Sequence, residues 1–357
     1  MTKTRRQVLV MGGNIAALMA VNAPIALAAD AKKLSFGVGL KALNASVINC
    51  VIGEVLGYNA QEGFSIDVQA LGTNSNVQTA TDRGTVKVGI GVPSTMLPIL
   101  AKGEWQGAKM FYQYTYPYKW DIAVAPGSLL KSYADLKGKK VGVSDFGATE
   151  YPVTKNVLKA LGLDPEKDVS WVSVGNGTPA GVALQRGVVD ALAYFDTGFG
   201  QIEAAGIEMT YLPRPSTIPM VGGQFLMAMP AAFERDRDLL IGFGRSVCKA
   251  SQFLLANPTA GAKAFLKMYP ETAPRGSSEE QAVKAILQSI GRRIKLYAPP
   301  YADTKVGAIN EQEFRTEAEM NVLAIKDYKA AYTNELIDKI NDFDLAKVQA
   351  EAMAYKG

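Results

Sequence analysis

The amino-acid sequence predicts an α/β protein built from two lobes. From Lys33 onward, short β-prone segments alternate with helical segments, which is typical of βαβ units and parallel sheets. The chain of 357 residues is longer than a single hydrophobic core usually supports. A third observation is a pattern of turn, helix, Arg-Gly and strand that occurs twice, at residues 72–91 and 175–194.

The N-terminal residues have the pattern of an export signal. A basic start (MTKTRRQ) precedes a short apolar run at 15–21, and Ala26-Leu27-Ala28 fits signal-peptidase cleavage. The apolar run is too short to span a membrane. TRRQVLV also fits a twin-arginine signal in part, so the general secretory and twin-arginine routes both remain open. We expect residues 1–28 to be removed on export.

The composition excludes several classes of protein. Removal of the leader lowers the formal charge of +4 by three, and a nearly neutral chain argues against nucleic-acid binding. The sequence contains no histidine, which excludes Ser-His-Asp triads, Cys-His pairs and His-ligated metals. Cys50 and Cys248 lie in apolar helical patterns, which favours buried free thiols over a disulfide. We therefore expect no catalytic residues, no metal, no cofactor and no enzymatic activity.

The first lobe is expected to begin with three strands and three helices. The strands are predicted at 34–40, 64–72 and 86–94, and the helices at 44–58, 75–83 and 94–103. GVGLKA after the first strand fits a dinucleotide fingerprint, but a lone match favours a structural glycine loop.

An aromatic segment at 108–128 follows and has no helical pattern. We expect strands that leave the first lobe. Strand alternation would place Tyr112, Tyr114, Tyr116 and Tyr118 on one face. At least one of these tyrosines or Trp120 is expected to reach a cleft, although ordinary core packing is the alternative for each ring.

The second lobe is expected to repeat the alternation. Strands are predicted at 140–146, 169–175, 189–195 and 209–214, and helices at 148–162, 178–186 and 198–206. A further strand at 225–230 leads into a mostly helical C-terminal third.

The two similar segments have a common position in these units. GTNSNVQTATDRG (72–84) and GNGTPAGVALQRG (175–187) each place a polar turn at the carboxyl end of a strand. Ligands of open α/β sheets bind at that edge. We interpret the repeat as one half-site built twice, with one copy in each lobe facing across a cleft.

An ordered set of segments carries a family resemblance. DLKGKKVGV (135–143), LKALGLDPEKDVSWVSVG (158–175), ALQRGVVDALAY (183–194) and the C-terminal stretch 332–356 follow one another. This succession resembles the periplasmic solute-binding proteins of ABC importers, in the group that includes nitrate-, sulfonate- and taurine-binding proteins. The same superfamily includes binders and makers of thiamine-pyrimidine precursors.

The resemblance implies a two-lobed type II periplasmic binding protein fold with the ligand cleft between the lobes. Lobe 1 would comprise 31–125 and 222–357, and lobe 2 would comprise 126–221. The implied function is capture of a small anionic organic solute, a sulfonate or carboxylate with a ring-bearing body among the options, for an ABC importer. The alternative is binding of a thiamine-precursor pyrimidine or similar heterocycle. Eukaryotic relatives that make this pyrimidine consume their own histidine, which this chain lacks. A periplasmic monomer that contacts a membrane permease is expected.

We expect the anionic group to sit at the turn SDFGATEY (144–151). A helix begins there, and its free N–H groups and partial positive charge would face the cleft. Gly147 would allow close approach, and Thr149 would donate or cap. Glu150 would point away from an anion or pair with a cationic part of the ligand. The full set of expected ligand-binding residues is Lys41, Asn44, Asn74, Ser75, Ser94, Thr95, Tyr116, Trp120, Ser144, Phe146, Gly147, Ala148, Thr149, Asn176, Thr178 and Asp196.

Overall fold

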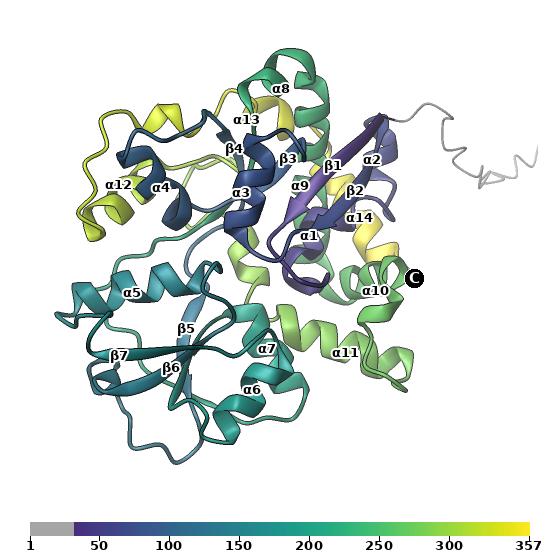
Figure 1. Ribbon diagram of the computed structural model, residues 1–357. Coiled ribbons are helices and arrows are strands. Elements are labelled where there is room, and N and C mark those ends of the chain that lie inside the picture. Colours follow the sequence, from purple (N-terminus) through teal and green to yellow (C-terminus); the bar gives the residue numbers. More distant parts are fainter. Residues whose placement is uncertain (1–31) are drawn as a thin grey trace, which may run out of the picture.

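The computed structural model describes residues 32–357. The predicted leader, residues 1–28, lies outside the described residues. Figure 1 shows two lobes, each built around its own sheet with helices packed against it. The prediction of a two-lobed α/β architecture is confirmed.

The two five-stranded sheets have the same layout. The first sheet has the order β2 (Phe64–Ala70), β1 (Lys32–Val38), β3 (Val88–Gly91), β10 (Gln224–Ala228), β4 (Lys109–Thr115). The second has the order β7 (Val169–Ser173), β6 (Lys139–Val143), β8 (Ala191–Phe195), β5 (Trp120–Val124), β9 (Thr210–Tyr211). In the first sheet, β1 pairs in parallel with β2 and β3, and β10 pairs antiparallel with β3 and β4. In the second, β6 pairs in parallel with β7 and β8, and β5 runs antiparallel to β8 and β9.

The helices of the first lobe differ from the sequence prediction in one place. A single helix was expected at 44–58, but two glycines interrupt it. Gly53 packs so closely on the Ser246 hydroxyl that a side chain would overlap it, and Gly57 has a positive φ of 77°. The resulting elements are η1 (Ala45–Val47), α1 (Ile48–Val51) and α2 (Tyr58–Gln61), followed by α3 (Asn74–Asp82) and α4 (Pro93–Ala101).

The two similar sequence segments occupy equivalent places in the two lobes. Helix α3 connects β2 to β3, and α6 (Thr178–Gln185) connects β7 to β8. Each helix ends at an arginine followed by a glycine with a φ of 68°, a conformation that glycine adopts without steric cost. The other helices of the second lobe are η2 (Tyr133–Leu136), α5 (Glu150–Ala160) and α7 (Asp196–Ala204).

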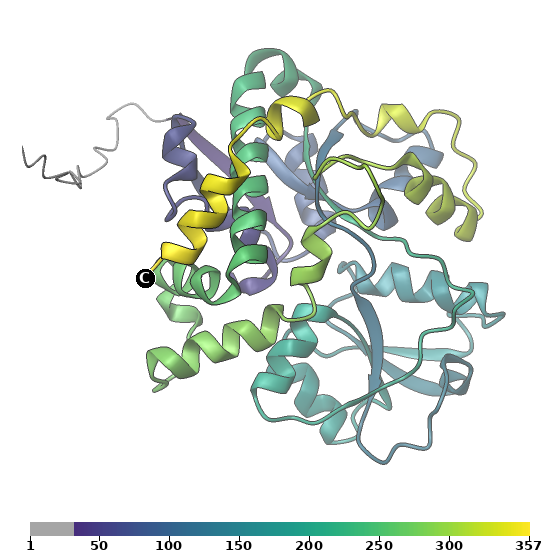
Figure 2. The ribbon, with the colours of Figure 1, turned by 180° about the vertical axis from the view of Figure 1, so that it is seen from behind.

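The C-terminal third packs mainly on the first lobe. Phe243 of the long helix α9 (Arg237–Ala256) lies with its ring centroid 5.1 Å from that of Phe36 in β1. Figure 2 shows α9 crossing the back of this lobe beside α14 (Leu345–Ala354). The remaining elements are α8 (Pro230–Arg235), α10 (Pro258–Met268), η3 (Pro270–Thr272), α11 (Glu279–Ile290), η4 (Ile294–Tyr297), α12 (Glu311–Met320), η5 (Tyr328–Ala330) and α13 (Ile337–Ile340).

Two crossings connect the sheets. The sequence placed the first crossing near residue 125, but β5 already pairs with β8 in the second sheet. The chain therefore leaves the first sheet between Thr115 and Trp120. The return crossing lies between Tyr211 and Gln224, which includes the expected boundary of 221/222.

Helix α11 of the C-terminal third also contacts the second lobe. Gly200 of α7 faces the α11 backbone so closely that a Cβ there would lie 2.6 Å from the Cα of Ser289. The Ser289 hydroxyl donates to the Thr197 carbonyl at 3.2 Å. This tight packing holds the residues that follow α11 between the two lobes.

Candidate ligand site between the lobes

A polar cavity of about 60 Å³ lies between the two lobes. Its walls come from the carboxyl ends of strands in both sheets and from the first crossing, and the carboxyl ends of strands are where open α/β sheets bind ligands. The lining residues are Gly39, Leu40, Ser46, Val47, Gly72, Asn74, Ile90, Tyr114, Lys119, Trp120, Ser144, Ala148, Thr149, Glu150, Asn176, Phe195, Gln224 and Arg293.

Both of the similar turns contribute to this cavity. Gly72 and Asn74 follow β2 in the first lobe, and Asn176 follows β7 in the second. The Thr73 hydroxyl accepts from the Asn76 N–H at 3.2 Å and caps α3, which fixes the turn that carries Asn74. The repeated local pattern thus places an amide side chain on each side of the same cavity.

Lys119 is the first of two buried cations at the cavity. Its side chain is 5% exposed, and its Nζ lies 4.8 Å from the centre of the Trp120 ring. Within residues 32–357, Nζ has neither a hydrogen bond nor an ion pair. Burial lowers the pKa of Lys119, as does the nearby Arg293, while Asp196 and Glu150 partly oppose this shift. An anionic ligand group would supply the missing partner.

Arg293 is the second cation and is held by both lobes. Its Nε donates to Asp196 Oδ2 at 2.6 Å, its Nη2 donates to the other carboxylate oxygen, and its Nη1 donates to the Ser46 carbonyl at 3.1 Å. Arg293 and Asp196 are 1% and 2% exposed. Burial opposes the guanidinium charge, but Asp196 more than offsets this and raises the pKa of Arg293. The paired carboxylate fixes the guanidinium at the cavity wall.

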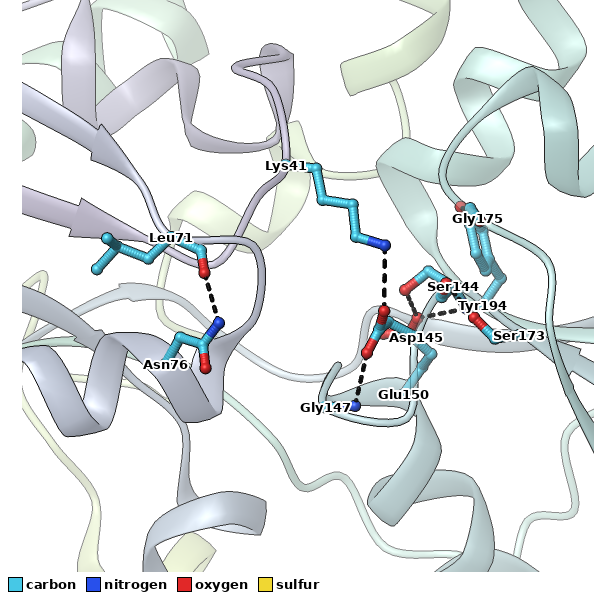
Figure 3. A network of polar contacts seen from close by, with 10 residues as sticks. All are labelled: Lys41, Leu71, Asn76, Ser144, Asp145, Gly147, Glu150, Ser173, Gly175 and Tyr194. Atoms are coloured by element: carbon cyan, nitrogen blue, oxygen red, sulfur yellow. Dashed lines mark hydrogen bonds and ion pairs between the residues drawn. The ribbon is translucent and has the colours of Figure 1, made fainter.

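Glu150 places a carboxylate in the same cavity. Its Oε1 accepts from the backbone N–H of Ser144 at 3.0 Å and from the Ser144 hydroxyl (Figure 3). Burial raises the pKa of Glu150, while the bonds from Ser144 and the charge of Lys119 act in the opposite direction. The Glu150 side chain therefore lines the cavity at the start of α5, where the sequence analysis placed the ligand's anionic group.

Direct contacts between the lobes enclose the cavity on one side. Lys41 Nζ lies 3.1 Å from Asp145 Oδ2, a contact that spans the gap between the lobes in Figure 3. Asn74 Nδ2 donates to Thr149 Oγ1, and the Ser75 hydroxyl donates to the Gly147 carbonyl at 3.4 Å. The lobes are thus in a closed arrangement.

The structure brings only part of the predicted site to the cavity. Lys41, Ser75 and Gly147 contact the opposite lobe without lining the cavity. The predicted residues that line it are Asn74, Trp120, Ser144, Ala148, Thr149 and Asn176. The predicted residues that neither line it nor contact the opposite lobe's turns are Asn44, Ser94, Thr95, Tyr116, Phe146, Thr178 and Asp196.

Several of these outlying residues have local roles instead. Asn44 accepts from the Ser46 N–H at 3.0 Å and caps η1. The Tyr116 ring is buried, and its hydroxyl accepts from the Gly307 N–H at 2.9 Å. Asp196 is occupied by Arg293. Asn44 and Thr178 both line a neighbouring hollow of about 380 Å³.

Others lie on helix starts or on the surface. The Thr95 hydroxyl donates to the Val92 carbonyl at 2.9 Å within the first turn of α4, and the neighbouring Ser94 is buried. Phe146 is 52% exposed and packs against Tyr151.

The expected ligand-binding residues did not include Lys119, Arg293 or Phe195, and Tyr114 was named only as one of several rings of which at least one would reach the cleft. Lys119 directly precedes Trp120, an expected ligand-binding residue, so the sequence contained a signal that Lys119 lies near the site. Arg293 follows α11 in the C-terminal third, and its local sequence carries no indication of a ligand site. Tyr114 lines the cavity and donates its hydroxyl to Gln224 Oε1 at 2.9 Å, which fixes both side chains.

The state of the two cysteines agrees with the sequence prediction. Cys50 and Cys248 are buried free thiols, as predicted. No group of three or more His, Cys, Asp or Glu side chains that could hold a metal occurs in the part of the chain that the structure describes. Among the same residues, no helix has the length and hydropathy needed to cross a membrane.

Comparison with solved structures identifies the fold. A protein of Bordetella bronchiseptica RB50 shares 23% identity with a TM-score of 0.67, covering 87% of this chain and 97% of that one. The alkanesulfonate-binding protein SsuA of Xanthomonas axonopodis pv. citri, solved with MOPS, shares 16% identity (TM-score 0.56, 87% and 96% covered). A Candida albicans protein described as having the generic periplasmic binding protein fold shares 14% identity (TM-score 0.50, 82% and 95% covered). The predicted periplasmic binding protein fold is confirmed.

The fold also occurs in an enzyme. The desulfurization enzyme DszB, solved as a cysteine-to-serine mutant with biphenyl-2-sulfinic acid, shares 14% identity (TM-score 0.53, 87% and 99% covered).

A search of curated proteins gave no match. Residues 44–261, more than half of the chain, match the family model described as NMT1/THI5 like. The chain therefore belongs to the NMT1/THI5-like family, as the resemblance predicted.

Proposed function

We propose that this protein captures a small organic anion outside the cytoplasm and presents it to an ABC importer without transforming it. The observation that carries the proposal is the pair of buried cations, Lys119 and Arg293, at an enclosed cavity between the lobes. Arg293 has Asp196 as its partner, so Lys119 is the charge that an anion would balance. Sulfonate-binding relatives of the same fold support this ligand class.

The carboxylate of Glu150 restricts which anions fit. An anion beside Glu150 would be repelled unless another part of the ligand donates a hydrogen bond or carries a positive charge. We therefore propose that the solute has an anionic group directed toward Lys119 and a donor group directed toward Glu150. Inorganic anions such as nitrate lack such a donor.

The volume of the cavity limits the size of the enclosed part of the ligand. One water occupies about 10–15 Å³ on this measure, so a cavity of about 60 Å³ has room for a compact group of a few heavy atoms. Trp120, Tyr114 and Phe195 supply apolar ring surface around it. A ring-bearing ligand, including a pyrimidine, would need a wider separation of the lobes than the one described.

An enzymatic role is the second candidate, because DszB has a similar fold. A thiol nucleophile needs an exposed thiolate. The Cys50 thiol is 2% exposed, and burial raises its pKa despite the nearby Arg293. Burial likewise raises the pKa of Cys248 to about 11. These thiols are poor nucleophiles, and the chain has no histidine to activate a serine.

A ligand screen with a turnover control tests the proposal. The mature protein would be screened by thermal shift against alkanesulfonates, aminosulfonates, MOPS, carboxylates, nitrate and pyrimidines. A hit at about 100 times its dissociation constant should stabilise the protein by about 2.7 kcal/mol. Lys119→Met should lose this shift, whereas Lys305→Met, at an exposed ion pair that does not line the cavity, should retain it. Chemical conversion of a hit, followed by mass spectrometry, would overturn the assignment as a binding protein.

A further inference from the structure

Two glutamates of α12 are buried beside the return crossing without a basic partner. Glu313 and Glu317 are 5% and 2% exposed, and their spacing of four residues places them on one face of the helix. Glu313 accepts from Gln113 Nε2 at 3.0 Å and from the Tyr301 hydroxyl at 2.7 Å. Neither carboxylate oxygen of Glu317 has a hydrogen-bond partner among residues 32–357.

The elements packed around this pair supply no compensating positive charge. The titratable groups that face it are Tyr301, from the loop after η4, and Tyr116, at the end of β4. Helix α4, which contacts α12, contains no titratable residue. Helix α5 also contacts α12, but its Lys155 pairs with Glu166 and its Lys159 is exposed.

Two buried carboxylates without a cation cannot both remain ionised at low cost. The pKa of Glu317 is raised to about 8. Burial is the largest cause of this shift, and the negative charge of Glu313 is the second largest. The N–H of Gly222 offsets part of this shift but falls outside hydrogen-bond geometry. A protonated carboxyl would act as a donor, and the Gln113 Oε1 atom, which also lacks a partner, is a suitable acceptor in this cluster.

A proton fits this cluster better than a metal ion does. Calcium takes six to eight oxygen ligands. In the described part of the chain, the unpartnered side-chain oxygens of the cluster are those of Glu317 and the Oε1 of Gln113. A proton needs only one donor oxygen and one acceptor.

The return crossing connects the acid pair to the ligand cavity. Gly222 has a φ of 86° and lies so close to Trp120 that a Cβ there would overlap the indole ring. A Cβ on Gly223 would likewise overlap the Gln113 side chain. The next residue, Gln224, lines the cavity. Gly222, Gly223 and Gln224 thus lie between the pair of glutamates and the wall of the ligand cavity.

We propose that Glu313 and Glu317 share one proton at the return crossing, and that its loss displaces Gly222 and the indole of Trp120, so that the shape of the ligand cavity depends on pH. The sign of the effect on stability follows from linkage. The protonated form is favoured in the folded state, whereas Glu317 in the unfolded chain ionises near its ordinary pKa of 4.5. The stabilisation is therefore complete below about pH 4.5 and is lost as the pH rises from there through about 8.

Thermal unfolding between pH 5 and pH 9 tests the shared proton. Glu317→Gln mimics the neutral acid, so we expect it to match the wild type at pH 5 and to have the higher Tm above pH 8. Glu319→Gln, an exposed position on the same helix, serves as the control and should follow the wild type throughout. Glu313→Gln removes the neighbouring charge and should move the transition to lower pH. If Glu317→Gln follows the wild type at every pH, the proposal is wrong.

Tryptophan fluorescence of the protein without the expected leader, residues 1–28, tests the coupling to the cavity. We expect an emission change with a midpoint near pH 8 in the wild type that is absent in both Glu317→Gln and Trp120→Phe. A change that persists in Glu317→Gln would overturn the proposed coupling. Calcium and a chelator test the alternative of a bound cation. If the Tm of the wild type rises with calcium and falls with a chelator, and that of Glu317→Gln does not, the site holds a cation instead of a proton and the proposal is wrong.

Discussion

The buried pair of Asp196 and Arg293 gives the sharpest quantitative prediction that needs no ligand. Asp196→Asn preserves the size of the side chain but leaves Arg293 and Lys119 as two buried cations without the carboxylate. Breaking a buried ion pair by removing one partner costs about 3–5 kcal/mol. Unfolding entropy of about 2.1 cal/mol/K per residue gives about 0.7 kcal/mol/K for roughly 330 residues, so Tm should fall by about 4–7 °C.

The pH dependence separates this electrostatic loss from a simple packing defect. Arg293 stays charged at all accessible pH values, but Lys119, whose pKa is already lowered by burial, can release its proton. The destabilisation should therefore decrease as the pH rises through the lowered pKa of Lys119.

Calorimetry or circular dichroism would measure both effects, with Asp338→Asn as the control. Asp338 pairs with Lys305 at an exposed site, where such a change costs about 0–1 kcal/mol. If Asp196→Asn costs no more than Asp338→Asn, the pair at the cavity wall is not desolvated as described. A loss that does not vary with pH would contradict the role assigned to Lys119.

Three further predictions concern the closed arrangement of the lobes and the aromatic wall. A Cβ on Gly147 would lie 3.0 Å from the Thr73 side chain of the other lobe, so Gly147→Val should hinder closure of the lobes. The overpacking of about 1–3 kcal/mol should weaken ligand binding by about 5–150-fold, while the Tm without ligand stays within about 1 °C of the wild type. Unchanged affinity by isothermal titration calorimetry would refute this. Trp120→Ala should weaken binding and also lower stability by about 3–5 kcal/mol, because the ring is 1% exposed; loss of binding at an unchanged Tm would instead place the ring at an open cleft surface. Lys41→Gln should expand the radius of gyration measured by solution scattering at low salt, because it removes the contact with Asp145, and about 0.5 M salt should abolish the difference between variant and wild type.

Much of the fold follows from patterns that are local in the sequence. The alternation of strands and helices, and the Arg-Gly ends of α3 and α6, depend on residues a few positions apart, and the structure has both. The first crossing was misplaced because β5 is β-prone like β4, and only strand pairing assigns it to the second sheet. The break in the helix expected at 44–58 depends on Ser246, which lies almost two hundred residues away in sequence.

The candidate site was less predictable because its charges come from outside the repeated units. The turns that carry Asn74 and Asn176 were recognisable from their position after strands. Glu150 was recognised as a difficulty for an anion, but its bond to Ser144 depends on the geometry at the start of α5. Arg293 reaches the cavity only because α11 packs closely on α7, and no pattern near Arg293 encodes that contact.

This division between repeated and unrepeated parts explains why the two similar turns would not bind an anion by themselves. The turns contribute neutral amides, Asn74 and Asn176, which can orient a ligand but carry no charge. Lys119 lies in the first crossing, and Arg293 follows α11, so both cations belong to segments that occur once in the chain. Arg293 binds the Ser46 carbonyl of one lobe and the Asp196 carboxylate of the other. Arg293 therefore connects the two lobes directly at the wall of the cavity that they enclose.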